Sequence, residues 1–264
     1  MPAPSPEPGP PRASAWRGLL FLVPIALWTL GGAALVALIA VLVPAVRRGG
    51  FVPLVRLWGR VPLRLCGVAL EVHGREHVAT PAPRLILFNH VSLLDLYVLA
   101  ALAPPRPLVL YKKEFSRIPG LGLALRTLRM IPVDRGNHEA AVRSVAEAGQ
   151  RLVDEGASCL MAPEGTRSRR GGLQDFKLGA FHLAATRGIP IVPMVMQGIE
   201  RVLPMGSYLI RSGTVRVDYL APIDTTGWRA DEARSHAREV RARFLELVPP
   251  APGSEGGPPL SGSA

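Results

Sequence analysis

Cysteine and lysine are both scarce in this chain of 264 residues. The two cysteines, Cys66 and Cys159, lie far apart in apolar or small-residue surroundings, which predicts reduced, buried thiols in a cytoplasmic compartment and no disulfide framework. Three of the 31 basic residues are lysines, Lys112, Lys113 and Lys177, and all three lie beside candidate motifs. Either a compact, rotatable charge is needed there or the clustering is due to chance.

Several motifs of common enzyme classes are missing as well. The chain has no Gly-x-Ser-x-Gly nucleophile elbow and no P-loop, so hydrolase and kinase functions lack support. The net charge is +11, yet no aromatic-interleaved basic stripe or nucleic-acid motif accompanies it. We therefore expect no nucleic-acid partner. The excess of cations predicts contact with an anionic membrane surface or with phosphate-bearing substrates.

A metal site is not expected either. His73 to His77 match the H-x-x-E-H pattern of inverted zinc peptidases, whose chemistry needs both histidines on one helical face. Gly74 follows an apolar, strand-like run and favours a turn, and too few other ligand clusters occur to complete a site. The sequence predicts neither a metal nor a resident cofactor.

Charge is absent from Leu19 to Val46, a run longer than the ~20 residues that span a bilayer and longer than the apolar part of a signal peptide. Arginines are enriched after the run, so the positive-inside rule predicts attachment to the cytoplasmic (inner) membrane, with the catalytic domain facing the cytoplasm. Pro24 and the Gly31-Gly32 pair leave open whether the run spans the membrane or forms two short helices within one leaflet.

The remaining composition predicts the organisation of the chain. Residues 51–70 combine apolar residues with arginines at helical spacing, which indicates an amphipathic segment at the membrane interface or an ordinary core-facing helix. The predicted regions are a disordered N-terminus at 1–16, a membrane anchor at 17–48, an interfacial segment at 49–70, a catalytic domain at 71–247 and a disordered tail at 248–264.

Short apolar runs alternate with helical patterns from residue 85 onward. The predicted strands cover residues 85–88, 108–111, 130–133, 158–162, 191–196 and 214–219, and the predicted helices cover 94–102, 137–153, 180–187 and 230–247. Strands separated by helices predict an α/β fold with a mainly parallel sheet that helices cover on both faces. Active sites of such sheets gather at the strand ends.

A histidine and a carboxylate follow the first of these strands. His90 comes directly after residues 85–88, and Asp95 lies about one helical turn further on, where it can orient the imidazole and leave Nε2 as a base. The spacing from Ser92 to Asp95 also fits a capping box, in which Asp95 closes the start of a helix.

A second motif follows the strand at 158–162. In Pro163-Glu164-Gly165-Thr166-Arg167-Ser168, Gly165 allows a phosphate to approach free backbone N–H groups, and Arg167 supplies a bidentate fork. We expect Glu164 to orient this arginine or to contact hydroxyl groups of the molecule that carries the phosphate. A solvated turn with surface charges is the alternative.

These motifs resemble the glycerolipid acyltransferases of the 1-acyl-glycerol-3-phosphate (lysophosphatidic acid) acyltransferase type. Four blocks occur in the family's order between about residues 70 and 220. They are Asn89-His90-x4-Asp95, Lys113-Glu114 with Pro119-Gly120 and Ile131 to Arg135, Pro163 to Ser168, and Ile189 to Met194 closing at Gly198. Two positions depart from the family pattern, which commonly has Phe at Ala162 and a second lysine at Leu178. Both leave the identity of the acceptor less secure.

The resemblance implies the glycerolipid acyltransferase fold and an O-acyltransferase that makes phosphatidic acid in phospholipid biosynthesis. It implies that His90 and Asp95 are catalytic, and the substrate-binding candidates are Lys113, Arg135, Glu164, Gly165, Thr166 and Arg167. The expected partners are a lysophospholipid acceptor, acyl-CoA or acyl carrier protein as donor, and membrane lipids. The alternatives are the same reaction on another lysolipid, such as a lyso-ornithine lipid, and a non-catalytic lipid-binding membrane protein.

Overall fold

A seven-stranded sheet organises the molecule, with strand order β1-β7-β6-β2-β5-β3-β4. The computed structural model describes residues 15–43, 50–167, 172–204, 207 and 210–248. The strands are β1 (Val68–His73), β2 (Arg84–Phe88), β3 (Pro107–Lys112), β4 (Ile131–Val133), β5 (Ser158–Met161), β6 (Ile191–Gln197) and β7 (Gly213–Tyr219). Neighbouring strands are parallel except β6 and β7, which pair antiparallel.

Strand β2 shows why the centre of this sheet is apolar throughout. All five of its residues are buried, because successive side chains point to opposite faces and helices cover both. Ile86 and Phe88 join the core formed with α2 (Val52–Leu65) and α3 (Asp95–Ala101). Leu85 and Leu87 join the core on the opposite face.

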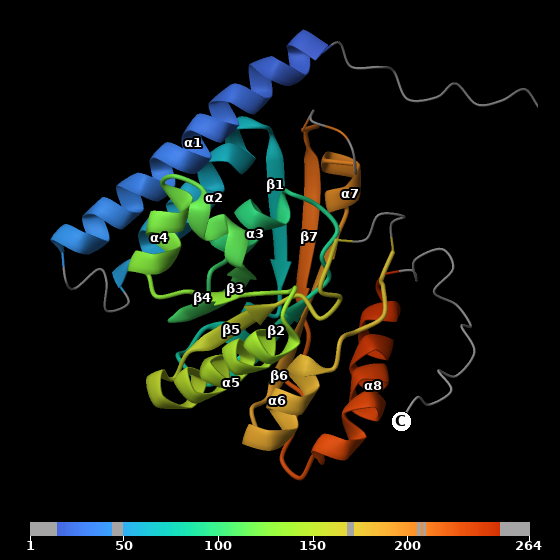
Figure 1. Cartoon of the computed structure of the whole chain (residues 1–264). Coiled ribbons are helices and arrows are strands. Elements are labelled where there is room, and N and C mark those ends of the chain that lie inside the picture. The colour runs from blue at the N-terminus through green and yellow to red at the C-terminus, as the bar shows by residue number, and fades with distance from the viewer. Residues whose placement is uncertain (1–14, 44–49, 168–171, 205–206, 208–209, 249–264) are drawn as a thin grey trace, which may run out of the picture.

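The helices form a layer on each face of the sheet (Figure 1). With α2 and α3 lie α1 (Ala15–Leu42) and α4 (Leu121–Thr127), and α7 (Ile199–Val202) follows β6. The opposite face carries α5 (His138–Glu155), α6 (Gly179–Arg187) and α8 (Ala233–Leu245). Short 3-10 helices occur at η2 (Arg75–Val78), η3 (Lys113–Arg117) and η4 (Ala230–Glu232). The predicted α/β class with a mainly parallel sheet is confirmed.

Helix α1 is continuous, although Pro24 and the Gly31-Gly32 pair predicted a possible break. Its segment Val23–Leu42 is long and apolar enough to cross a membrane, and no other helix in the described residues is. About 22% of this segment is buried in the fold. The indole N–H groups of Trp28 and Trp58 donate to each other's backbone carbonyls, at 3.0 and 3.3 Å. Ala33 and Ala37 pack on Ala124 of α4. One side of α1 is therefore fastened to the catalytic domain.

Some boundaries differ from the prediction. Strand β1 begins at Val68, inside the predicted interfacial segment 49–70, and it extends the sheet by pairing with β7. Helices α4 and α7 were not predicted, because each is too short to show a helical period. Predicted helix 230–247 is divided into η4 and α8. Residues 1–14 and 249–264, most of the two segments predicted to be disordered, lie outside the described residues.

Candidate active site

The site begins where β2 ends, at Asn89 and His90. The Asn89 side chain is buried between β2 and β6, where its amide donates to the Met196 carbonyl and accepts from the Met196 N–H, both at 2.8 Å. This pair continues the sheet hydrogen bonds by one residue after the strand. The backbone directly before His90 is therefore fixed to β6, and His90 follows at the edge of the sheet.

His90 and Asp95 are brought together as the sequence suggested. His90 Nδ1 lies 2.6 Å from Asp95 Oδ2, and the imidazole is 29% exposed whereas the carboxylate is 1% exposed. An Nδ1–H that donates to this carboxylate leaves Nε2 free to accept a proton on the accessible side. Burial raises the pKa of Asp95, while the hydrogen bonds from His90 and from two backbone amides oppose the rise.

The helix-closing alternative for Asp95 also describes a real contact. The same oxygen, Oδ2, accepts the backbone N–H groups of Val91 at 3.0 Å and Ser92 at 3.1 Å. Ser92 Oγ in turn accepts the N–H of Leu94 at 3.2 Å. One carboxylate thus orients the histidine and shapes the turn that carries it, so the two interpretations describe the same geometry.

Glu164, in the second motif, bonds to backbone groups of two other segments. Its side chain is 3% exposed, and its two oxygens accept the backbone N–H groups of His90 at 2.8 Å and Gln174 at 2.9 Å. In the described structure these oxygens bond to backbone N–H groups and not to Arg167. Glu164 instead ties the Pro163–Arg167 loop to the residue that carries the imidazole, and burial raises its pKa.

The cations of the second and third blocks gather at the same edge. Arg135, which follows β4, donates to the carbonyl of Gly165 at 2.5 Å. Lys113 follows the neighbouring strand β3, and its Nζ lies 3.2 Å from Asp134. Arg167 lines a small hollow with Val91, Ser92 and Leu93, the residues directly after His90. The parallel order of β2, β5, β3 and β4 brings these groups together, because all four strands end at one edge.

The backbone of the loop leaves room for a ligand. Gly165 has φ of +73°, a backbone conformation that is strained for residues with a side chain. Thr166 beside it is exposed. A Cβ built on Gly165 would lie 3.4 Å from the Lys177 side chain. Lys177 was not among the predicted binding residues. The scarcity of lysine in this chain and the place of Lys177 after the motif were signals for it.

Known proteins match this chain over the region that builds the site. The family described as Acyltransferase matches residues 69–197. Over 191 residues, 72% of this chain and 67% of the relative, the chain is 32% identical to a 1-acyl-sn-glycerol-3-phosphate acyltransferase of Limnanthes douglasii. This chain belongs to the 1-acyl-sn-glycerol-3-phosphate acyltransferase family. The predicted resemblance is confirmed, and the protein is an O-acyltransferase.

Other members of the family and a solved structure agree. The chain is 32% identical over 183 residues, 69% of its length and 65% of the relative, to the 1-acyl-sn-glycerol-3-phosphate acyltransferase alpha of Homo sapiens. The crystal structure of the 1-acyl-sn-glycerophosphate (LPA) acyltransferase of Thermotoga maritima is similar in fold, with a TM-score of 0.72 at 24% identity, over 87% of this chain and 93% of that one. The acyltransferase fold assigned from the sequence is confirmed.

Two positions that depart from the family pattern are occupied by packing residues. Ala162 packs against the core shared with α2 and α3, and Leu178 packs against the core of the opposite face. The H-x-x-E-H residues do not share a helix, because His73 ends β1 and His77 lies in η2. Within the described ranges, no group of three His, Cys, Asp or Glu side chains lies close enough to hold a metal ion.

Proposed function

We propose that this acyltransferase transfers a fatty acyl group from a thioester donor, acyl-CoA or acyl carrier protein, to the sn-2 hydroxyl of lysophosphatidic acid. The product is phosphatidic acid. The observation that carries the proposal is the contact of 2.6 Å between His90 Nδ1 and buried Asp95, beside an edge with several cations. The activity for which the relatives are named supports the same acceptor.

In the proposed mechanism His90 is the general base. Nε2 takes the proton of the acceptor hydroxyl as its oxygen forms a bond to the thioester carbonyl carbon. Collapse of the tetrahedral intermediate breaks the C–S bond, and the imidazolium returns its proton to the leaving thiolate. Asp95 keeps the imidazole in the required tautomer and stabilises the imidazolium, as the carboxylate does in hydrolytic triads.

Direct transfer needs no acyl-enzyme. The nearest hydroxyl along the chain, that of Ser92, is buried and donates to the Leu203 carbonyl at 3.2 Å. Cys159 lies on β5 with its side chain fully buried, and burial raises the pKa of its thiol to about 12. A neutral, enclosed thiol is a poor nucleophile.

The acceptor phosphate is proposed to lie against the Gly165–Arg167 loop. Arg167 offers two parallel N–H donors, and Lys113 and Arg135 add positive charge at the same edge. Arg135 also holds the loop through its bond to the Gly165 carbonyl. The Lys177 side chain lies beside Gly165, and we add it to this set.

Membrane attachment through α1 is part of the proposal. Since one side of α1 is fastened to α2 and α4, a helix that crossed the bilayer would draw these elements into the hydrocarbon. Leu27, Leu35 and Leu38 are exposed on α1, at 68%, 56% and 53%. We propose that this side enters one leaflet of the cytoplasmic (inner) membrane, with the catalytic domain on the cytoplasmic side.

Transfer of labelled oleoyl groups from oleoyl-CoA to lysophosphatidic acid by the detergent-purified full chain tests the function. We expect wild type to make phosphatidic acid and His90→Ala to lose about 10²–10⁴ of the rate. His182→Ala is the matched control, since His182 is exposed on α6. Near-normal turnover by His90→Ala would contradict the mechanism. Preference for a lyso-ornithine lipid in competition, or binding of lysolipids without turnover of either donor, would replace the proposed function.

A further inference from the structure

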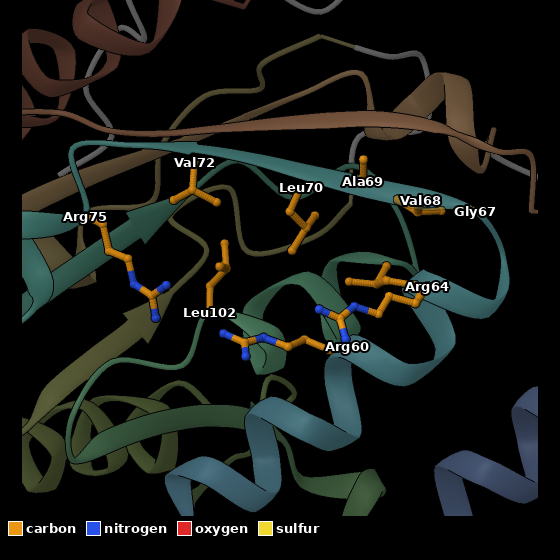
Figure 2. Close-up of a pocket in the computed structure, with 10 residues that line it drawn as sticks. Arg60, Arg64, Gly67, Val68, Ala69, Leu70, Val72, Arg75 and Leu102 are labelled. Atoms are coloured by element: carbon orange, nitrogen blue, oxygen red, sulfur yellow. The ribbon is translucent and has the colours of Figure 1, made fainter.

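A second basic site lies away from the catalytic edge, between α2 and the edge strand β1. A cavity of about 510 Å³ opens there, with an apolar wall that includes Leu70, Val72 and Leu102. Arg60 and Arg64 reach it from α2, and Arg75 reaches it from η2 (Figure 2). In Figure 2 the side chains of Arg60 and Arg75 extend toward Leu102 from opposite sides of the hollow.

These arginines have no acidic partner in the described part of the chain. None of Arg60, Arg64 and Arg75 takes part in an ion pair there. The nearby carboxylates of β1 and β7 are engaged elsewhere, Glu71 with His73 at 2.8 Å and Asp218 with Arg216 at 2.9 Å. Positive charges that converge without compensation repel one another, and a bound anion relieves the repulsion.

A fourth arginine, Arg56, lies on the same helix as Arg60 and Arg64. Arg56 precedes Arg60 by one helical turn and is held by a 2.8 Å bond to the Ala103 carbonyl. Burial, with the charges of Arg75 and Arg60, lowers the pKa of Arg56. The spacing of Arg56, Arg60 and Arg64 places three guanidinium groups along one side of α2.

The surface beside the arginines is apolar, and this combination indicates the kind of ligand. Leu57 and Leu65 of the same helix are 57% and 81% exposed, and α1 beside it carries further exposed leucines. A helix with arginines along one side and exposed leucines on another suits the boundary between headgroups and acyl chains. Guanidinium groups match phosphate oxygens, and the apolar wall matches an aliphatic chain.

We propose that this cavity binds the phosphate of an anionic phospholipid, with part of its chain against Leu70, Val72 and Leu102. The site differs from the acceptor site, because β1 is at one end of the sheet and three strand pairings separate it from β2, which carries His90. The choice of a membrane lipid as the source rests on the proposed attachment of α1. A lipid held there orients α2 at the leaflet.

Partitioning of the full chain into vesicles tests the site without using turnover, so the outcome is independent of the proposed reaction. The measured quantity is the ratio of partition coefficients for phosphatidylcholine vesicles with and without 20% phosphatidylglycerol. The attraction of three arginines to an anionic surface predicts a ratio of at least about tenfold for wild type. The combined variant Arg60→Gln, Arg64→Gln and Arg75→Gln should reduce it to about twofold or less.

Matched variants separate a built site from general charge. Arg187→Gln, Arg234→Gln and Arg238→Gln remove the same charge from exposed positions on α6 and α8, and this variant should keep the wild-type ratio. Because Arg64 is exposed, Arg64→Gln alone should fold normally and lose part of the ratio. Equal losses in both triple variants, or no loss in the cavity variant, would overturn the proposal.

Two further arms identify the ligand. Arg167→Gln should keep the wild-type ratio of partition coefficients. If this variant loses the ratio, anionic lipid binds at the catalytic loop, and the proposal of a second site is wrong. Inorganic phosphate at millimolar concentration and constant ionic strength should leave the ratio unchanged. If phosphate abolishes the ratio, the cavity takes a free anion and the lipid assignment is wrong.

Discussion

At the scale of single residues, two buried carboxylates hold His90, one from its own motif and one from a motif 74 positions away. Asp95 bonds to the imidazole of His90, and Glu164 bonds to the backbone N–H of the same residue. His90 is thereby held at its ring and at its main chain. A carboxylate that accepts several hydrogen bonds inside a protein fixes its donors more firmly than an exposed one.

Replacing Asp95 by Asn should separate orientation from packing. The amide oxygen can still accept the N–H groups of Val91 and Ser92, but the charge that stabilises the imidazolium is lost. We expect kcat to fall about 10²–10⁴-fold with a small change in the melting temperature. Initial rates with saturating acyl-CoA and lysophosphatidic acid measure the effect. A kcat within threefold of wild type would remove Asp95 from the mechanism.

Glu164 makes stability depend on pH in a predictable direction. Its folded-state pKa is raised above the ordinary value of 4.5, so the native state binds more protons than the unfolded state above pH 4.5. The free energy of unfolding should therefore fall as pH rises from 4.5 through the raised pKa. Glu164→Gln should remove this dependence of the free energy of unfolding on pH. Because the amide has one acceptor oxygen fewer, the variant should also be less stable than wild type at pH 4.5, the low end of this range, by about 1–3 kcal/mol. Denaturant unfolding at pH 4.5 to 7 compares the two proteins, and identical slopes would contradict the assignment.

Arg167→Lys keeps the charge and removes the fork. A lysine cannot offer two parallel N–H donors to a phosphate, so we expect the KM for lysophosphatidic acid to rise about tenfold with kcat changed less. Arg187→Lys on α6 serves as the control at an exposed position. An unchanged KM would place the acceptor phosphate elsewhere.

At the scale of elements, α2 and α3 approach so closely that one position admits no side chain. A Cβ on Gly59 would lie 2.4 Å from the Ala101 nitrogen and 2.6 Å from the Tyr97 oxygen. Helix α3 begins at Asp95, so the packing that holds α2 on the sheet also holds the helix that starts at the catalytic carboxylate.

Gly59→Ala should therefore push α2 and α3 apart. We expect a loss of about 1–3 kcal/mol in the free energy of unfolding, as for an overpacked core, and a lower kcat. Gly179→Ala is the matched control, because a Cβ at the start of α6 meets nothing within 4 Å. Equal stabilities of the two variants would show that the helices shift apart at no cost.

At the scale of the whole molecule, apolar and basic surfaces meet on one side. Helices α1 and α2 lie on the same face of the sheet, whereas α5, α6 and α8 cover the other face (Figure 1). Helix α1 carries exposed leucines, and α2 carries three arginines. This division predicts that the molecule enters the membrane by one face.

Leu38→Asp should weaken membrane attachment far more than Val142→Asp. Both side chains are 53% exposed, but Leu38 lies on α1 and Val142 on α5. A carboxylate in hydrocarbon costs about 2.5–3.5 kcal/mol, so vesicle partitioning should fall about 100-fold for the first variant and change little for the second. Equal partitioning of the two variants would mean that the exposed side of α1 does not enter lipid.

The sequence by itself determined the class of the fold, the apolar N-terminal helix and the histidine with its carboxylate. Each of these is a local pattern: alternating apolar runs, an uncharged stretch, and a spacing within one turn. Periodicity also located most strands and helices, but not the short α4 and α7.

Tertiary structure alone decided the contacts between distant segments. Glu164 reaches the backbone of His90 across 74 positions, Arg135 reaches the Gly165 carbonyl, and Arg75 joins Arg60 at a cavity. No local period encodes such pairs, since they depend on strand order and on which strand ends share an edge. For the same reason the bonds of Glu164 to backbone N–H groups were not predicted from sequence, since an acidic residue beside an arginine resembles a surface pair until its burial is known.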